Sequence, residues 1–217
     1  MSLHSKNTIY FFGDSFTYGD GCRPSFEYHA MYPKSEDFLW PNLVASNLNM
    51  EVCNLGLPGL SNMGILRELT KSMSKFEQGD IVIIGKTDPY RFEIPYKHKR
   101  GFVNILANNS SFGTETQNNI IHQYEKHIHL PSYTLLDNRL GESIRGISDF
   151  LCKNDILTLI WKHGTDSDAD IDIDLRPHKK INEITNGLIK DHHFAWEGHD
   201  SFSKKILSII KKYKNGI

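Results

Sequence analysis

Apolar runs alternate with amphipathic segments along the first 85 residues. Three short apolar runs, Thr8–Phe12, Val52–Leu55 and Asp80–Ile84, are each followed directly by a glycine. Such continuous runs are typical of strands buried in a parallel sheet. Between them, Asp37–Leu48 and Met63–Phe76 place their apolar residues at helical spacing. Strands that alternate with helices in this way predict an α/β protein with a parallel sheet.

The second half of the chain continues the alternation after an interruption. Residues 86–113 are polar, rich in aromatic residues, Asn and Ser, and weakly periodic, which indicates a long loop or a small hairpin above the sheet. Two further helices, a fourth strand and a final helix are then predicted at residues 114–130, 135–151, 155–161 and from about Glu197. We therefore expect a single domain over residues 1–217, a three-layer α/β/α sandwich with a loop or hairpin insertion at about 86–113.

Composition excludes several classes of protein. The 217 residues include 25 Lys and Arg against 26 Asp and Glu, a formal net charge of −1, so no nucleic-acid partner is expected. Three widely spaced cysteines form no CxxC pair and predict reduced thiols. No apolar run approaches the roughly 18–20 residues of a membrane span, and no signal peptide is recognisable. We expect a cytoplasmic protein without a membrane partner, and no feature of the sequence specifies an oligomeric state.

The segment Gly13–Gly19 (GDSFTYG) follows the first predicted strand and is the first candidate for chemistry. A serine at the carboxyl end of a strand, flanked by glycines, can expose its hydroxyl and offer its own backbone N–H to a developing oxyanion. The alternative interpretation is a strand-ending turn in which Ser15 only caps a helix.

Taken with two other segments, GDSFTYG resembles block I of the SGNH (GDSL-type) hydrolases, serine esterases with a flavodoxin-like α/β/α fold. The resemblance implies that Ser15 is the nucleophile. Asn54–Gly59 (NLGLPG) resembles block II and places the oxyanion-hole glycine of the family at Gly59, where the missing Cβ lets the backbone approach a substrate. Trp40-Pro41 is similar to the pair that opens the next helix in many relatives.

The third block departs from the family pattern. Where the family has G-x-N-D, this chain has Gly85–Asp88 (GKTD), so Thr87 stands in the position of the oxyanion-binding asparagine. A hydroxyl donates one hydrogen bond and has a shorter reach than a carboxamide. Either Thr87 takes this role or a neighbour does, for which Asn62, Lys86 and Arg91 are the candidates.

The last block, DHHFAWEGH beginning at Asp191, resembles the segment that carries the remaining triad residues. A glycine–histidine pair at the expected offset implies that His193 is the catalytic base, with His192 and His199 as alternatives. The family usually has D-x-x-H, but that position is Lys190 here. In an extended segment residues i and i+2 point the same way, so Asp191 can reach His193 and fix its tautomer.

Two other clusters invite a metal-binding interpretation. The alternating aspartates lack the glycine and glutamate of an EF-hand loop, which favours an acidic solvated loop or an edge strand at these positions. The histidines before them lack an HExxH pattern. We therefore expect no metal site and no cofactor. The residues concerned are Asp166, Asp168, Asp170, Asp172 and Asp174, and His122, His127 and His129.

Together the motifs predict a serine esterase that cleaves small acyl esters, with O-acetyl groups on a carbohydrate as the first choice of substrate. The predicted triad is Ser15, His193 and Asp191, and the predicted oxyanion hole is formed by Ser15, Gly59 and Thr87. Candidates for contact with the substrate are Asp14, Asn62, Asp88 and Arg91. The alternatives are a non-catalytic relative that binds a sugar or a partner protein in the same cleft, and an acyltransferase that uses the same triad.

Overall fold

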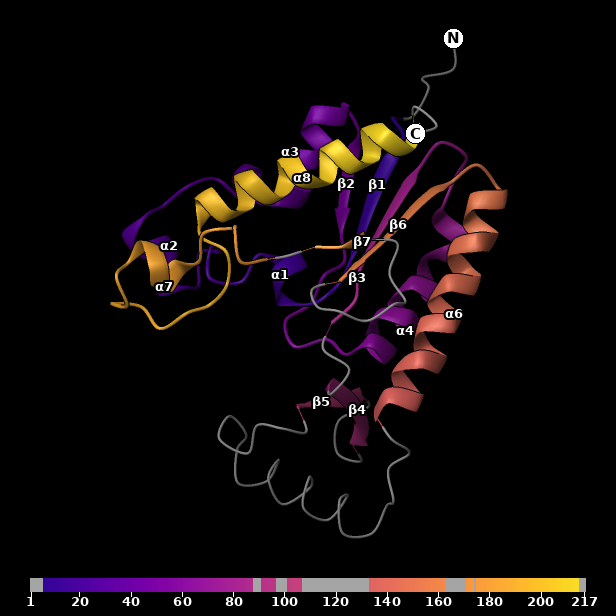
Figure 1. The fold of residues 1–217 in the computed structure, drawn as a ribbon, viewed down its shortest axis with the longest axis horizontal. Coiled ribbons are helices and arrows are strands. Elements are labelled where there is room, and N and C mark those ends of the chain that lie inside the picture. Colours follow the sequence, from indigo (N-terminus) through magenta and orange to yellow (C-terminus); the bar gives the residue numbers. More distant parts are fainter. Residues whose placement is uncertain are drawn as a thin grey trace.

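The computed structural model contains a central five-stranded sheet in which all neighbouring strands are parallel (Figure 1). The strand order is β2-β1-β3-β6-β7. The structure describes residues 6–87, 91–96, 101–106, 133–162, 171–173 and 175–214. The five strands are β1 (Thr8–Phe12), β2 (Glu51–Asn54), β3 (Ile81–Gly85), β6 (Leu157–Lys162) and β7 (Ile171–Asp172).

This order is that of a flavodoxin-like doubly wound sheet, in which ligands bind at the carboxyl ends of the strands. All four strands predicted from the apolar runs are present, each within one or two residues of the predicted ends. The fifth, β7, is an edge strand in the aspartate series, where a solvated loop or an edge strand is expected. It has only two residues, lies among aspartates and is a strand because it pairs with Trp161 and Lys162 of β6.

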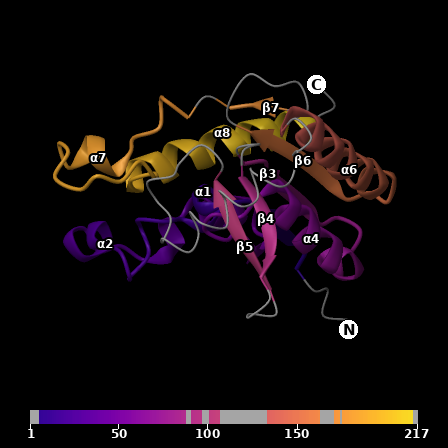
Figure 2. The ribbon, with the colours of Figure 1, turned by 90° about the horizontal axis from the view of Figure 1, so that it is seen from below.

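Alternate residues of the strands face two separate apolar layers. In β1, Ile9 and Phe11 belong to one cluster of buried side chains, and Tyr10 and Phe12 belong to the other. Helices α3 and α8 supply the first cluster, and α4 and α6 supply the second, so the sheet is covered on both faces (Figure 2). The predicted three-layer sandwich is therefore confirmed. These helices are α3 (Trp40–Leu48), α4 (Asn62–Ser72), α6 (Tyr133–Lys153) and α8 (Trp196–Lys214).

Local sequence explains where the helices begin. Pro41 lies in the first turn of α3, where its missing N–H leaves no hydrogen bond unmade. Ser61 caps α4 by accepting a hydrogen bond from the N–H of Gly64, at 3.1 Å. The shorter helices are α1 (Ser15–Tyr18), α2 (Glu27–Met31) and α7 (Ile181–Ile184), with 3₁₀ turns at η1 (Glu36–Phe38) and η2 (Met73–Lys75).

A two-stranded hairpin lies within the predicted insertion. It consists of β4 (Arg91–Tyr96) and β5 (Gly101–Leu106) and is antiparallel. The buried carboxylate of Glu93 on β4 pairs with both terminal nitrogens of Arg67 on α4, which ties the hairpin to the sandwich. The helix predicted at residues 114–130 lies outside the described residues.

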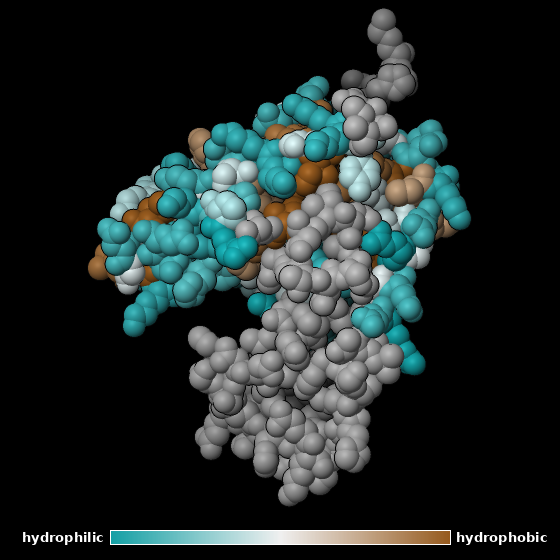
Figure 3. All heavy atoms as spheres, in the orientation of Figure 1, coloured by the Kyte–Doolittle hydropathy of each residue, from teal (hydrophilic) through white to brown (hydrophobic). Residues whose placement is uncertain are grey.

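The three cysteines are free thiols in different environments: Cys22 is buried, Cys53 is half-buried and Cys152 is exposed. Hydrophilic side chains predominate over the described part of the face in Figure 3, with smaller hydrophobic areas between them. Within the described ranges, no helix combines the length and the apolar character that a membrane crossing requires.

The stability of the fold is expected to depend on His199, which is buried in α8. Its Nδ1 accepts a hydrogen bond from the N–H of Trp40, at 3.2 Å, and burial lowers its pKa to about 3. The folded protein thus keeps His199 neutral, while the unfolded chain takes up a proton as the pH falls below about 6.5. We expect this group to cost about 2 kcal/mol of stability between pH 7 and pH 5.

Urea unfolding at pH 7 and pH 5 tests this expectation. In His199→Asn the amide oxygen can still accept from Trp40, but nothing titrates, so the variant should lose less stability on acidification than the wild type. The raised pKa of His193 acts in the opposite direction in both proteins and cancels from the comparison. An equal loss of stability in both proteins would contradict the assignment.

Candidate active site

The predicted site residues gather at the carboxyl edge of the sheet. Ser15 is the first residue of α1, directly beyond β1, and Thr87 follows β3. Asp14 is the N-cap of α1, and its carboxylate accepts a hydrogen bond from the N–H of Phe16, at 3.0 Å. The GDS segment thus does form a strand-ending turn with a capped helix. The capping residue is Asp14, which leaves the Ser15 hydroxyl free of that role.

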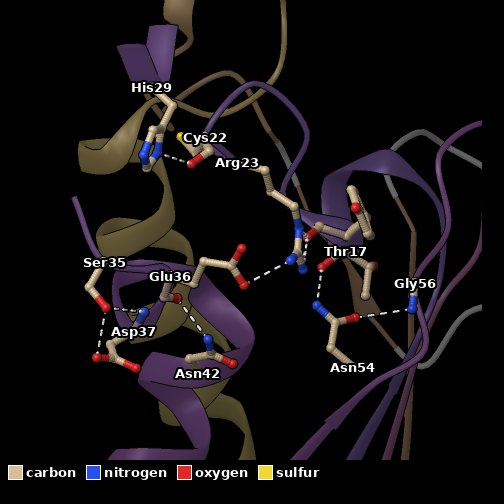
Figure 4. Close-up of polar contacts among 11 residues, drawn as sticks. Thr17, Cys22, Arg23, His29, Ser35, Glu36, Asp37, Asn42, Asn54 and Gly56 are labelled. Carbon is tan, nitrogen blue, oxygen red and sulfur yellow. Dashed lines mark hydrogen bonds and ion pairs between the residues drawn. The ribbon is translucent and has the colours of Figure 1, made fainter. Parts of the chain in front are cut away.

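The single turn of α1 is held from the outside by two side chains (Figure 4). The amide of Asn54 donates to the carbonyl of Thr17 at 2.9 Å, and its oxygen accepts from the N–H of Gly56. Arg23 donates two hydrogen bonds to the carbonyl of Tyr18 and stacks over its ring. Because the last carbonyls of this short helix have partners, Ser15 is fixed on a rigid element.

His193 and Asp191 form a hydrogen-bonded pair. One carboxylate oxygen of Asp191 accepts from Nδ1 of His193 at 2.7 Å and from the backbone N–H of His193 at 2.9 Å. The segment bends at His193 and docks on α7, where the N–H of Ile181 donates to the carbonyl of His193 and that of Asn182 to the carbonyl of Asp191. A proton on Nδ1 leaves Nε2 as the basic nitrogen of the neutral ring.

The imidazole lies beside α1. Its ring centroid is 5.2 Å from that of Phe16, the residue after Ser15. Among the described residues, no hydrogen bond joins Ser15 Oγ to His193, and Nε2 instead lies 4.0 Å from a carboxylate oxygen of Asp20. Catalytic hydrogen bonds of free enzymes are often long and tighten only when substrate binds.

Burial and charge act against each other on these groups. Burial lowers the pKa of His193, but the hydrogen bond to Asp191 and the charges of Asp191, Asp20 and Asp14 raise the pKa more, so it lies above its usual value. Burial raises the pKa of Asp191, but its bonds to His193 outweigh this effect and leave the pKa below the usual value. Both shifts favour the charged forms of the pair.

The two predicted backbone donors of the oxyanion hole are unpaired. Among the described residues, neither the N–H of Ser15 nor that of Gly59 has a hydrogen-bond partner. Gly59 has φ +71°, and apart from its two chain neighbours no atom of the described residues lies within 4 Å of the position that a Cβ would occupy.

Thr87 is engaged elsewhere. Its hydroxyl donates to a carboxylate oxygen of Asp14 at 2.8 Å, and Arg91 of β4 pairs with the same oxygen at 3.2 Å. A hydroxyl has only one proton, so Thr87 would have to release Asp14 before it could donate to an oxyanion. Asp14 thus links the nucleophile turn, the end of β3 and the hairpin.

The other predicted residues occupy different positions. Asn62 is buried and exchanges two hydrogen bonds with the backbone of Thr87, and Lys86 is buried at the end of β3. Of the alternative bases, His192 is exposed and His199 is buried in α8. The described ranges hold no cluster of three potential metal ligands. Asp88 lies outside the described residues. So do His122, His127 and His129, and all of the aspartate series except Asp172.

Solved structures share this architecture. The esterase EstA from Pseudoalteromonas sp., in a structure inhibited by monoethylphosphonate, aligns over 96% of this chain and 99% of its own, with a TM-score of 0.50 and 11% identity. This chain has the SGNH-hydrolase fold. The acetyl xylan esterase Est2A from Butyrivibrio proteoclasticus aligns at a TM-score of 0.49 and 13% identity, over 98% of this chain and 65% of its own. AlinE4, an SGNH-hydrolase family esterase, aligns with a TM-score of 0.36 and 15% identity, over 74% of this chain and 60% of its own. No family model and no curated protein matches the sequence.

Three residues of this SGNH-fold site were not predicted to act there: Asp20, Asn54 and Arg23. Of the three, only Asp20 is marked by its place in the sequence, because it directly follows the last glycine of GDSFTYG. Asn54 was noted only as the first residue of the second block, and its bond across to α1 has no signature in the sequence. Arg23 is an isolated cation in a loop and acts only through the folded chain.

Proposed function

We propose that this protein is a serine esterase in which Ser15, His193 and Asp191 form the catalytic triad. The observation that carries the proposal is the Asp191–His193 pair, held against the short helix that begins with Ser15. A carboxylate on Nδ1 orients the ring and leaves Nε2 to accept the serine proton, as in other Ser-His-Asp systems. The SGNH fold, shared with the esterase EstA, supports the same reaction class.

The proposed reaction is acyl transfer in two steps. Nε2 of His193 takes the proton from Ser15 Oγ as this oxygen attacks the ester carbonyl. The negative charge develops on the carbonyl oxygen, which the N–H groups of Ser15 and Gly59 stabilise. His193 returns the proton to the departing alcohol, and water, activated by the same base, then releases the acid from Ser15.

The substrate proposed is a small ester on a polar molecule, such as an O-acetylated carbohydrate. The groups around Ser15 are polar: Asp14, Asp20 and Thr87 are buried beside it, and Arg91 pairs with Asp14. Polar groups of this kind orient a polar substrate through hydrogen bonds and give a long acyl chain little surface to bury.

A second candidate function is binding without turnover. It is favoured by one observation: the hydroxyl of Thr87 is held by Asp14, so the third donor that the family supplies from this position is engaged. Loss of one oxyanion donor lowers turnover by about 10²–10³-fold. A protein that has lost this donor can retain the cleft and bind a sugar without cleaving it.

The test is covalent labelling by a fluorophosphonate together with turnover of p-nitrophenyl acetate. We expect one label per chain, located on Ser15 by peptide mass spectrometry, and saturable release of p-nitrophenol that falls as the acyl chain is lengthened. Absence of both the label and turnover would refute the esterase and favour the binding protein. Transfer of the acetyl group to an added sugar in preference to water would indicate an acyltransferase.

A further inference from the structure

Asp20 is a buried carboxylate on the side of His193 opposite Asp191. One oxygen lies 4.0 Å from Nε2 of His193, and the other is buried and has no hydrogen-bond partner among the described residues. An ionised carboxylate buried in this way is costly unless an opposite charge compensates it. The protonated ring of His193 is the cation that the structure places beside it.

The loop that carries Asp20 is fixed to the nucleophile turn at one end and to the His193 segment at the other. The N–H of Asp20 donates to the carbonyl of Ser15 at 3.1 Å, so the carboxylate and the nucleophile belong to the same turn. The next residue, Gly21, has φ +82°, and a Cβ there would meet Asp191 Oδ2 at 2.9 Å. The thiol of Cys22 then contacts the carbonyl of Phe194 at 3.2 Å.

Because of these anchors, Asp20 lies beside the same nitrogen that the proposed triad assigns to Ser15. Nδ1 is already bonded to Asp191, so Nε2 is the remaining position for a proton on the ring. A protonated Nε2 is attracted to Asp20, whereas a neutral Nε2 can accept from Ser15 Oγ. The two partners therefore favour opposite protonation states of His193.

We propose that Asp20 is a positioning residue that competes with Ser15 for Nε2 of His193 and shifts the onset of activity to higher pH. This inference rests on the proposed esterase function. Whenever both ring nitrogens carry a proton, His193 lies between the carboxylates of Asp191 and Asp20 as an imidazolium and cannot act as a base. When Nε2 loses this proton to solvent, it becomes the acceptor for the proton of Ser15, and Asp20 stabilises the imidazolium that re-forms as Ser15 attacks.

The other groups around the pair act on Asp20 in both directions. Burial and the charges of Asp191 and Asp14 hold the pKa of Asp20 above its usual value, although the charges of His193 and Arg23 lower it. His192, on the same segment as His193, lowers the pKa of Asp191 by its charge, and the buried His199 of α8 is neutral. His193 and Arg23 are thus the groups that help to keep Asp20 ionised.

The test compares wild type with Asp20→Asn and Asp20→Glu, the second of which keeps the charge. The pH dependence of kcat/KM for p-nitrophenyl acetate should show an acid limb above pH 6.5 in the wild type. In Asp20→Asn the limb should move down by about 1 pH unit or more, as expected for loss of an opposite charge at this distance. In Asp20→Glu it should stay closer to the wild-type position. A limb that does not move in Asp20→Asn would overturn the proposal.

A second measurement does not depend on turnover. NMR titration of the His193 ring, identified by the signal absent from His193→Gln, should give a pKa that falls by about 1 unit or more in Asp20→Asn. If the wild type lacks esterase activity but this pKa still falls, the pairing of Asp20 with His193 stands and the proposed function fails. If the wild type is active and the pKa is unchanged, the pairing is refuted and the esterase stands.

Discussion

Ser15→Ala is expected to lower kcat for p-nitrophenyl acetate by roughly 10⁴-fold or more, because no covalent acyl-enzyme can form without the hydroxyl. The backbone N–H of residue 15 remains in place, so part of the oxyanion stabilisation is retained and some rate above that of water is expected. Ser15 Oγ has no hydrogen-bond partner among the described residues, so its removal should not destabilise the fold.

The matched control for this experiment is Ser143→Ala. Ser143 is exposed on α6, on the other side of the sheet from His193, and its hydroxyl donates only to a carbonyl of its own helix. Its kcat and fluorophosphonate labelling should equal those of the wild type. An activity of Ser15→Ala within tenfold of the wild type (about 1.4 kcal/mol of barrier) would mean that Ser15 is not the nucleophile.

His193→Gln is expected to have an effect of similar size, while His192→Gln should leave kcat within about twofold. The physical reason is the surroundings of the two side chains. His193 is bonded to Asp191 and lies against Phe16, whereas His192 is exposed. Loss of the base from a triad costs about as much as loss of the nucleophile, because the residues act as a unit.

Combining Ser15→Ala with His193→Gln sharpens this test. If both residues serve one proton transfer, the double variant should be about as active as either single variant, not slower by the product of the two losses. Multiplicative losses would show that the two residues act independently. A large loss in His192→Gln with none in His193→Gln would assign the base to the other histidine.

Much of the fold could be predicted because its causes are local. Three of the four predicted strands end directly before a glycine, and continuous apolar runs such as those of β1 and β3 are buried almost throughout. The edge strand β2 is the exception, because its Val52 is exposed. The predicted helices of the described residues carry their apolar side chains at a spacing that produces one buried face. For β7 the sequence left a loop and an edge strand open, because its two residues form a strand only through pairing with β6.

Individual residues of the candidate site were predicted, but the hydrogen bonds between its distant segments were not. The D-x-H spacing indicated that Asp191 could reach His193, and the structure contains that hydrogen bond at 2.7 Å. The resemblance of GKTD to the third block of the family implied Thr87 as one candidate oxyanion donor, but nothing in the sequence showed that Asp14, 73 positions earlier, would hold its hydroxyl. Contacts between distant segments leave no periodic pattern from which they could be predicted.

The amino-acid sequence by itself determined the α/β class, the order of the strands along the chain and the short motifs that follow them, because these depend on hydrophobic periodicity and on neighbouring residues. Only the tertiary structure decided which partners those motifs have. It set Asp20 beside Nε2 of His193 and engaged Thr87 and Arg91 with Asp14. The reason is that parallel strands bring distant turns to one edge of a sheet, where burial makes each charged group dependent on its neighbours.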